Sequence, residues 1–73
     1  MFKNIVIIDD DQEIVDLLDE YLTNHNFKVS GFNNPLNALK ALEKKNEYEF
    51  IILDIMMPEM DGFQVLRKIR EFS

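Results

Sequence analysis

Two short runs of large apolar residues, IVII at residues 5–8 and FIIL at residues 50–53, each end directly at an aspartate. Neither run alternates with polar side chains, and both are rich in β-branched residues, which predicts strands buried on both faces of a parallel sheet. Because an unpaired carboxylate is costly to bury, Asp9 and Asp54 should mark the points where these strands leave the core. The question is what a carboxylate does at that position.

Strands and helices alternate along the whole chain. We predict strands over residues 3–8, 27–32 and 48–54, and helices over residues 11–26, 33–46 and 61–72. The helical spacing of apolar residues predicts that the following side chains face the core: Ile14, Leu17, Leu18, Tyr21 and Leu22 in the first helix, Leu36, Leu39 and Leu42 in the second, and Phe63, Leu66 and Ile69 in the third. This alternation indicates an α/β fold with a parallel sheet and helical crossovers.

The order of the strands decides where the acidic residues lie. The first and third strands are the more apolar, so we expect them side by side with the second strand outside, in the order 2-1-3. Right-handed crossovers then place helices on both faces of the sheet. Ligands of open α/β sheets bind where the chain reverses direction, outside the carboxyl ends of the strands. Asp9, Asp10 and Asp54 should therefore converge there.

Three carboxylates at one point suit a divalent cation. Two such charges about 4 Å apart repel by roughly 4 kcal/mol at an effective dielectric constant near 20, so the group needs a cation or a shared proton. Oxygen ligands alone favour Mg²⁺ or Mn²⁺ over Zn²⁺. Such an ion neutralises the negative charge of an incoming phosphoryl group, and aspartate is a known phosphoryl acceptor. Helix capping, which we expect of Asp11, and a solvated turn at Asp54 are the simpler interpretations.

Composition narrows the class of protein. The 73 residues suffice for one domain, and 47% of them are hydrophobic, as in a globular protein. A net charge of −6 weighs against nucleic acid as a direct partner, because binding to phosphates needs clustered Lys and Arg. The chain has no Cys, and its N-terminal apolar run is too short for a signal peptide or a membrane span. We therefore expect a soluble, cytoplasmic protein without a membrane partner.

The segments NIVIIDDDQEIVDLL and FIILDIMMPEMDGF resemble the first half of a response-regulator receiver domain of two-component signalling. The resemblance runs through all 73 residues. It implies a flavodoxin-like fold and a phosphoacceptor module of a phosphorelay, not an enzyme beyond weak autophosphorylation or autodephosphorylation. It also implies that Asp54 accepts phosphate from a sensor histidine kinase, while Asp9, Asp10, Asp54 and the backbone carbonyl of Met56 bind Mg²⁺.

Receivers of this family have five strands and five helices, so the resemblance implies that residues 1–73 form a truncated receiver domain with the order βαβαβα. The family's switch Ser or Thr and its phosphate-contacting Lys are missing from these residues. Phosphorylation adds about −1.5 to −2 charge to the acidic cluster, so we expect this shortened chain to bind Mg²⁺ weakly and to accept phosphate poorly. The third strand should keep an open edge and an apolar face, and we expect a homodimer formed through it.

Two other functions stay open. One is a non-signalling half-fold that self-associates as a homodimer and retains the acidic residues without using them. The other is an aspartyl phosphatase of the haloacid dehalogenase type, because Asp9 and Asp11 have the spacing of its two acids. Glu13, however, stands where that family has a Thr.

Overall fold

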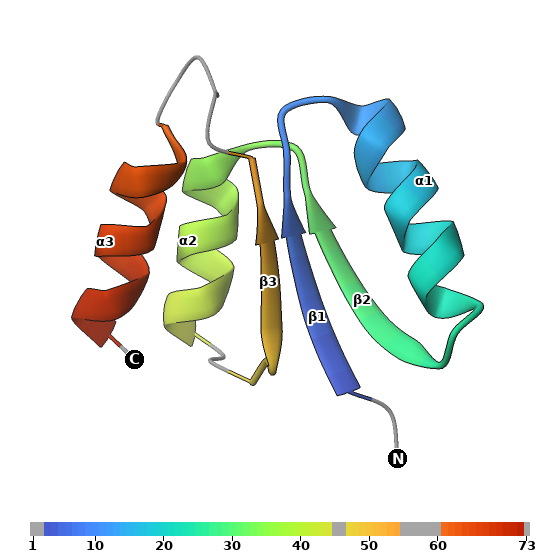
Figure 1. The fold of residues 1–73 in the computed structure, drawn as a ribbon. Helices are drawn as coiled ribbons and strands as arrows, with labels where there is room; N and C mark the ends of the chain where they lie inside the picture. The colour runs from blue at the N-terminus through green and yellow to red at the C-terminus, as the bar shows by residue number, and fades with distance from the viewer. Residues whose placement is uncertain (1–2, 45–46, 55–60, 73) are drawn as a thin grey trace.

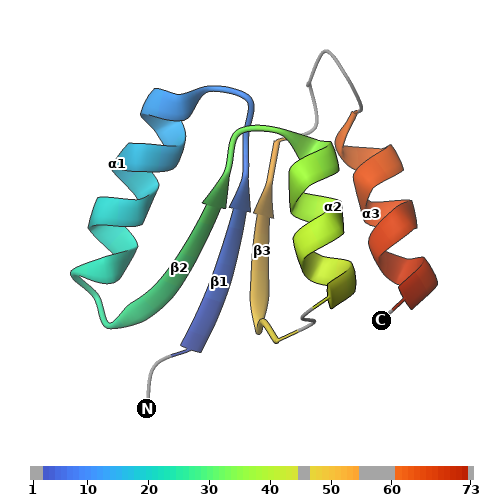
Figure 2. The same ribbon diagram turned by 180° about the vertical axis from the view of Figure 1, so that it is seen from behind.

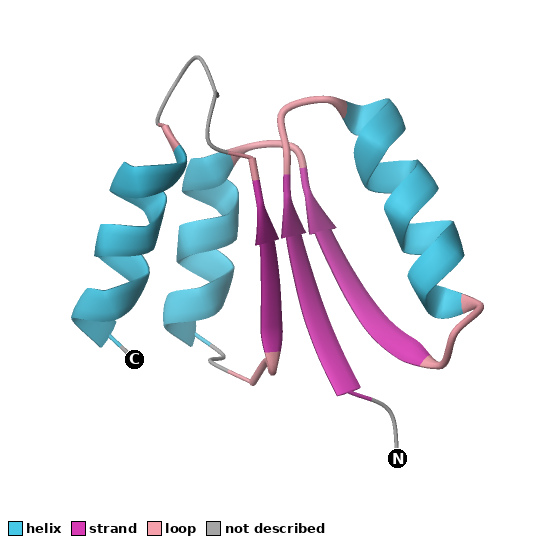
Figure 3. Ribbon diagram, viewed as in Figure 1, coloured by secondary structure: helices cyan, strands magenta, loops and turns pink. Residues whose placement is uncertain are grey.

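The structure, a computed structural model, describes residues 3–44, 47–54 and 61–72 (Figure 1). Strands and helices alternate along the chain as predicted (Figure 3). The elements are β1 (Lys3–Ile8), α1 (Gln12–Thr23), β2 (Phe27–Phe32), α2 (Pro35–Lys44), β3 (Phe50–Leu53) and α3 (Gly62–Phe72). Within the described ranges, none of the helices combines the length and the apolarity that crossing a membrane requires.

The three strands form one parallel sheet in the order β2-β1-β3, as the sequence predicted. Ile8, the last residue of β1, pairs with Phe32 on one side and with Leu53 on the other. Each of these partners is also the last residue of its strand. The carboxyl ends of all three strands therefore meet at one edge of the sheet, where the arrowheads point in Figure 1.

Helices cover both faces of the sheet, which gives the three layers of a flavodoxin-like half-fold (Figure 2). On one face, Ile5 and Ile7 of β1 pack with Val15 of α1. On the other face, Val6 and Ile8 pack against α2 and α3, whose contributions are Ala38, Leu39, Leu42, Val65 and Ile69. The alternate side chains of β1 thus enter two separate cores, which explains why this strand is apolar at every position from 5 to 8.

Polar side chains fix where the helices begin. The Asp11 carboxylate accepts a hydrogen bond from the backbone N–H of Glu13 at 3.0 Å and caps α1. Asn34 caps α2 by accepting from the N–H of Leu36 at 2.8 Å, and Pro35 takes the first helical position, where a missing N–H does no harm. The cap expected at Asp11 is confirmed.

The predicted inner faces of the helices are wrong in part. In α1 the buried residue is Val15, with Leu18 and Leu22 packed beside it, whereas Ile14 and Tyr21 are exposed and Leu17 is 67% exposed. The reason is that α1 packs over β2 and β1 through Val15, Leu18 and Leu22. Its second row of apolar residues, which is Ile14, Leu17 and Tyr21, lies outside this contact. In the other two helices Ala38, Leu39, Leu42, Val65 and Ile69 are buried, while Leu36, Phe63 and Leu66 are exposed.

Within the part of the chain that the structure describes, one face of β3 stays partly exposed. Phe50 and Ile52 pair with Ile5 and Ile7, so they lie on the face that carries α1. Because α1 packs over β2 and β1 on this face, Phe50 of β3 remains 52% exposed and Ile52 39% exposed. The other side chains of β3 pack into the core under α2 and α3. An apolar surface therefore lies beside α1.

Candidate metal and phosphoacceptor site

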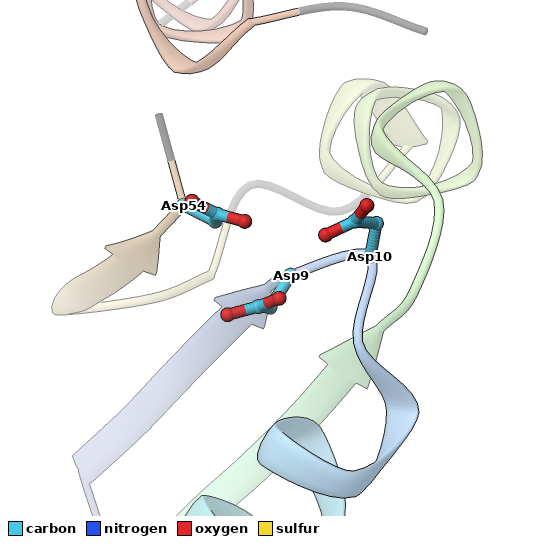
Figure 4. Close-up of side chains that lie close together, drawn as sticks. All are labelled: Asp9, Asp10 and Asp54. Atoms are coloured by element: carbon cyan, nitrogen blue, oxygen red, sulfur yellow. The ribbon is translucent and has the colours of Figure 1, made fainter. Parts of the chain in front are cut away.

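Asp9, Asp10 and Asp54 meet at the carboxyl edge of the sheet. One carboxylate oxygen from each of them lies within 4.8 Å of those of the other two. Figure 4 shows the Asp10 and Asp54 side chains pointing toward one another, with Asp9 beside them. Asp9 and Asp54 are half-buried and Asp10 is exposed. The predicted convergence is therefore observed, although 44 positions separate Asp54 from Asp10 in the sequence.

The parallel pairing of the strands brings Asp54 to its place. The backbone N–H of Asp54 donates a 2.9 Å hydrogen bond to the carbonyl of Ile8. This bond extends the pairing of β1 and β3 by one residue beyond the end of β3. Asp54 therefore leaves the sheet directly beside Asp9, and a shift in strand register would separate the two carboxylates.

The turn between β1 and α1 fixes the Asp9 carboxylate. The backbone N–H of Asp9 donates to the carbonyl of Phe32 at 3.1 Å, which holds the turn against the end of β2. The backbone N–H of Asp11 donates to Oδ1 of Asp9 at 3.0 Å. The first bond positions the backbone of Asp9, and the second orients its side chain.

The electrostatics of the cluster are those of like charges held together. The pKa of the Asp10 carboxyl lies above its ordinary value of 3.8, first because neighbouring protein removes part of its water. The Asp54 carboxyl acts next, through its charge and a hydrogen bond, and the Asp9 charge adds a smaller contribution in the same direction. Each of these factors disfavours the ionised form. A bound cation would reverse that balance.

The donor atoms suit a hard divalent cation. All three are carboxylate oxygens, and a set of few oxygens that leaves room for water is what Mg²⁺ prefers. Asp9, Asp10 and Asp54 could therefore hold Mg²⁺ or Mn²⁺. Met56, whose carbonyl we expected as a further ligand, lies outside the described residues, so that prediction stays a prediction.

Asp11 and His25 do not belong to this cluster. The Asp11 carboxylate caps α1, and among the described residues the acidic group consists of Asp9, Asp10 and Asp54. His25 lies beyond the far end of α1, where its ring stacks on Tyr21 at 4.3 Å between centroids. The spacing of Asp9 and Asp11 that suggested a phosphatase is explained by helix capping.

Comparison with known proteins decides the family. The sequence matches the family described as "Response regulator receiver domain" over residues 5–73. The chain belongs to the response regulator receiver domain family. It is 39% identical over 71 residues to the regulatory protein VanRc of Enterococcus gallinarum, and this match covers 97% of the chain but 30% of that relative. The receiver sequence thus spans about a third of the length of that relative.

Solved structures share the fold of this receiver. The response regulator protein TrrA of Thermotoga maritima, solved in complex with Mg²⁺-BeF, is 36% identical with a TM-score of 0.86, over 96% of this chain and 60% of that one. The chemotaxis protein CheY4 of Vibrio cholerae has a TM-score of 0.91 at 24% identity, over 97% of this chain and 58% of that one. The likeness to CheY4 shows the flavodoxin-like fold alone.

Sequence reasoning missed one contact beside the site. The side-chain amide of Asn33 donates a 2.7 Å hydrogen bond to Oε1 of Gln12. Nothing in the sequence distinguishes Asn33 from its neighbour Asn34, because both follow the same strand and both suit a turn. Only the distance in space between the start of α1 and the loop after β2 identifies the pair.

Proposed function

We propose that Asp54 of this receiver accepts a phosphoryl group while Asp9 and Asp10 hold Mg²⁺ or Mn²⁺ beside it. The observation that carries the proposal is the meeting of three carboxylate oxygens within 4.8 Å of one another at the ends of two neighbouring strands. The family to which the chain belongs supports it. So does the Mg²⁺-BeF complex of TrrA, which is 36% identical to this chain.

The chemistry is the transfer of one phosphoryl group to a carboxylate oxygen. A new bond forms between an Asp54 oxygen and phosphorus, and the bond from phosphorus to the leaving group of the donor breaks, with its electron pair leaving on that group. Mg²⁺, when held by Asp9 and Asp10, would supply positive charge beside the transferred phosphoryl group. Asp9, oriented by the N–H of Asp11, and Asp10 supply the acidic ligands. In this proposal the Met56 carbonyl completes the protein's ligand set.

The donor in the proposal is the phosphohistidine of a sensor histidine kinase, and the place of action is the cytoplasm. Receivers of this family are signalling modules, so catalysis by the chain itself is limited to weak autophosphorylation or autodephosphorylation. For residues 1–73 tested alone we expect slow phosphoryl transfer. The carboxylates of Asp9, Asp10 and Asp54 lie close together and have the same sign of charge as the incoming phosphoryl group. A phosphoryl group carries about −1.5 to −2 charge and replaces the single charge of the Asp54 carboxylate, so the cluster becomes more negative.

Incubation with acetyl phosphate and Mg²⁺, followed by intact-mass spectrometry, tests the proposal. We expect the mass to increase by one phosphoryl group, and the increase to disappear in Asp54→Asn and without Mg²⁺. Asp19→Asn is the matched control, since Asp19 lies in the second half of α1, outside the acidic cluster, and its carboxylate accepts a hydrogen bond from the Thr23 hydroxyl. Equal phosphorylation of Asp54→Asn and the unaltered chain would contradict the assignment.

A homodimer of the 73-residue chain is a second proposal, and the exposed face of β3 supports it. Phe50 and Ile52 are exposed on the face of the sheet that carries α1, and Leu17 and Tyr21 of α1 are exposed as well. Contiguous apolar surface on a small chain favours association, and two-fold dimers are the commonest result. In this second proposal the acidic residues need not signal.

A further inference from the structure

The acidic turn between β1 and α1, residues 9–11, is held at both ends by hydrogen bonds to two consecutive residues, Phe32 and Asn33. At its beginning, the N–H of Asp9 donates to the carbonyl of Phe32 at 3.1 Å. At its end, Oε1 of Gln12 accepts a 2.7 Å hydrogen bond from the side-chain amide of Asn33. Phe32 is the last residue of β2, and Asn33 follows it directly. Both ends of the acidic turn are therefore held at the carboxyl end of β2.

Asp16 sets the orientation of the Gln12 amide. Nε2 of Gln12 donates a 2.7 Å hydrogen bond to Oδ1 of Asp16, one helical turn further on. An ionised carboxylate only accepts hydrogen bonds, so the NH₂ group of Gln12 must face Asp16 and its oxygen must face the other way. That oxygen meets the Asn33 amide, which donates. The three side chains thus form a directed chain from the loop after β2 to the first turn of α1.

The end of the acidic turn next to α1 determines how the Asp9 carboxylate is oriented. Asp11, directly before Gln12, donates its backbone N–H to Oδ1 of Asp9 and so orients that carboxylate. The turn carries three acids in a row beside Asp54, and like charges push the turn away from the sheet. A lateral movement of the start of α1 would carry Asp11 away from Asp9. The bond between Gln12 and Asn33 opposes that movement.

We propose that Gln12 and Asn33 are positioning residues for the acidic site, and that their hydrogen bond holds Asp9 and Asp10 in the arrangement that binds the cation. This inference rests on the proposed function, because it takes Mg²⁺ as the ion bound there. Neither residue contacts the ion. Their contribution is preorganisation, since a site held in its binding geometry spends less free energy on ordering when the ion arrives.

The experiment compares Mg²⁺ affinity, measured by titration calorimetry, among Gln12→Ala, Asn33→Ala and the double variant. Both side chains are exposed, so we expect all variants to fold, as circular dichroism would verify. Thr23→Ala is the matched control, because it removes a side-chain hydrogen bond of 2.9 Å to Asp19 at the opposite end of the same helix. Hydrogen exchange of the Asp11 amide, measured by NMR without metal, gives a second readout of the turn.

We expect each single variant to bind Mg²⁺ roughly three- to tenfold more weakly, at or below the lower limit for residues that support metal ligands. The double variant should lose no more Mg²⁺ affinity than the single variants, because either change alone breaks the same hydrogen bond. The Asp11 amide should exchange faster in both variants and not in Thr23→Ala. Unchanged affinity in both single variants, or losses that Thr23→Ala reproduces, would overturn the inference. Absence of Mg²⁺ binding by the unaltered chain is a different result, and it would overturn the proposed function together with this inference.

Discussion

Val15 of α1 packs directly on Gly31 of β2, where a side chain would find no room. A Cβ atom built on Gly31 would lie 2.5 Å from Cγ1 of Val15. Val15 is the buried residue of α1, and its β-branched side chain has few alternative rotamers. This contact sets how closely the helix approaches the sheet. It thereby also sets where the acidic turn before the helix lies.

Gly31→Ala should destabilise the protein by about 1–2 kcal/mol. Overpacking of a core typically costs about 1–3 kcal/mol, and removal of a strand glycine returns roughly 0.5–1 kcal/mol. Chemical denaturation would measure the change. The neighbouring substitution Ser30→Ala introduces the same residue at an exposed position of β2 and should stay within about 0.5 kcal/mol of the unaltered protein. If steric overlap is the cause, adding Val15→Ala to Gly31→Ala should cost less than the sum of the two changes, and strict additivity would contradict this explanation.

Asp10→Asn should raise the melting temperature of the metal-free protein at neutral pH. The pKa of Asp10 is raised in the folded state, so its protonated form contributes stability that is fully present below the ordinary pKa of 3.8 and is lost as the pH rises through the folded pKa. At pH 7 the ionised side chain therefore opposes folding, and the amide removes this effect. Melting curves with and without Mg²⁺ would test it.

Added Mg²⁺ should reverse the order of the two proteins. The unaltered chain should be stabilised by the ion, because the ion binds the folded state, whereas Asp10→Asn should gain little. Asp19→Asn controls for the loss of one negative charge at a distance from the site. A lower melting temperature of metal-free Asp10→Asn would show that the cluster does not repel itself.

Asn26 connects α1 to β2 with a left-handed backbone, at φ 68°. Asn26→Ala should lower the free energy of unfolding by about 1 kcal/mol, because this conformation crowds the Cβ atom and Asn tolerates it better than Ala. Asn26→Gly should be at least as stable as the unaltered chain. Asn24→Ala is the matched control, since Asn24 has a right-handed φ of −69°. Equal losses at positions 24 and 26 in denaturation experiments would contradict the argument.

Phe50→Ser combined with Ile52→Thr should weaken the proposed self-association of the 73-residue chain. These residues are exposed on the uncovered face of β3, and burial of one such side chain contributes about 1.5–3 kcal/mol. Sedimentation velocity at several concentrations would measure the effect. Phe63→Ser is the control, because Phe63 is 61% exposed but lies on α3, across the sheet. A chain that sediments as a monomer throughout would contradict the dimer, and an equal loss in Phe63→Ser would exclude β3 as its surface.

The sequence was sufficient to predict the elements, the strand order and the meeting of the three acids. The reason is that continuous apolar runs identify central strands, and parallel strands bring their carboxyl ends to one edge. The inner faces of the helices were harder to predict. In α1, Ile14, Leu17 and Tyr21 have helical spacing as good as that of Val15, Leu18 and Leu22. The choice between these two stripes depends on the space above Gly31, which is a tertiary contact.

The hydrogen bond between Gln12 and Asn33, which we propose supports the acidic site, could not be predicted from the sequence either. The acids themselves follow from their places after strands. The bond between Gln12 and Asn33, by contrast, joins residues 21 positions apart, and it depends on the distance between the start of α1 and the loop after β2. Helical periodicity and turn propensity carry no information about that distance.

The most direct test of the account is a Mg²⁺ titration followed by NMR of the uniformly ¹⁵N-labelled protein. We predict saturable binding of one ion, with the largest shifts at the amides of Asp9, Asp10 and Asp54, and loss of that binding in Asp54→Asn but not in Asp19→Asn. Shifts distributed evenly over the acidic surface without saturation, or identical binding by Asp54→Asn, would contradict the claim that these three carboxylates form one cation site.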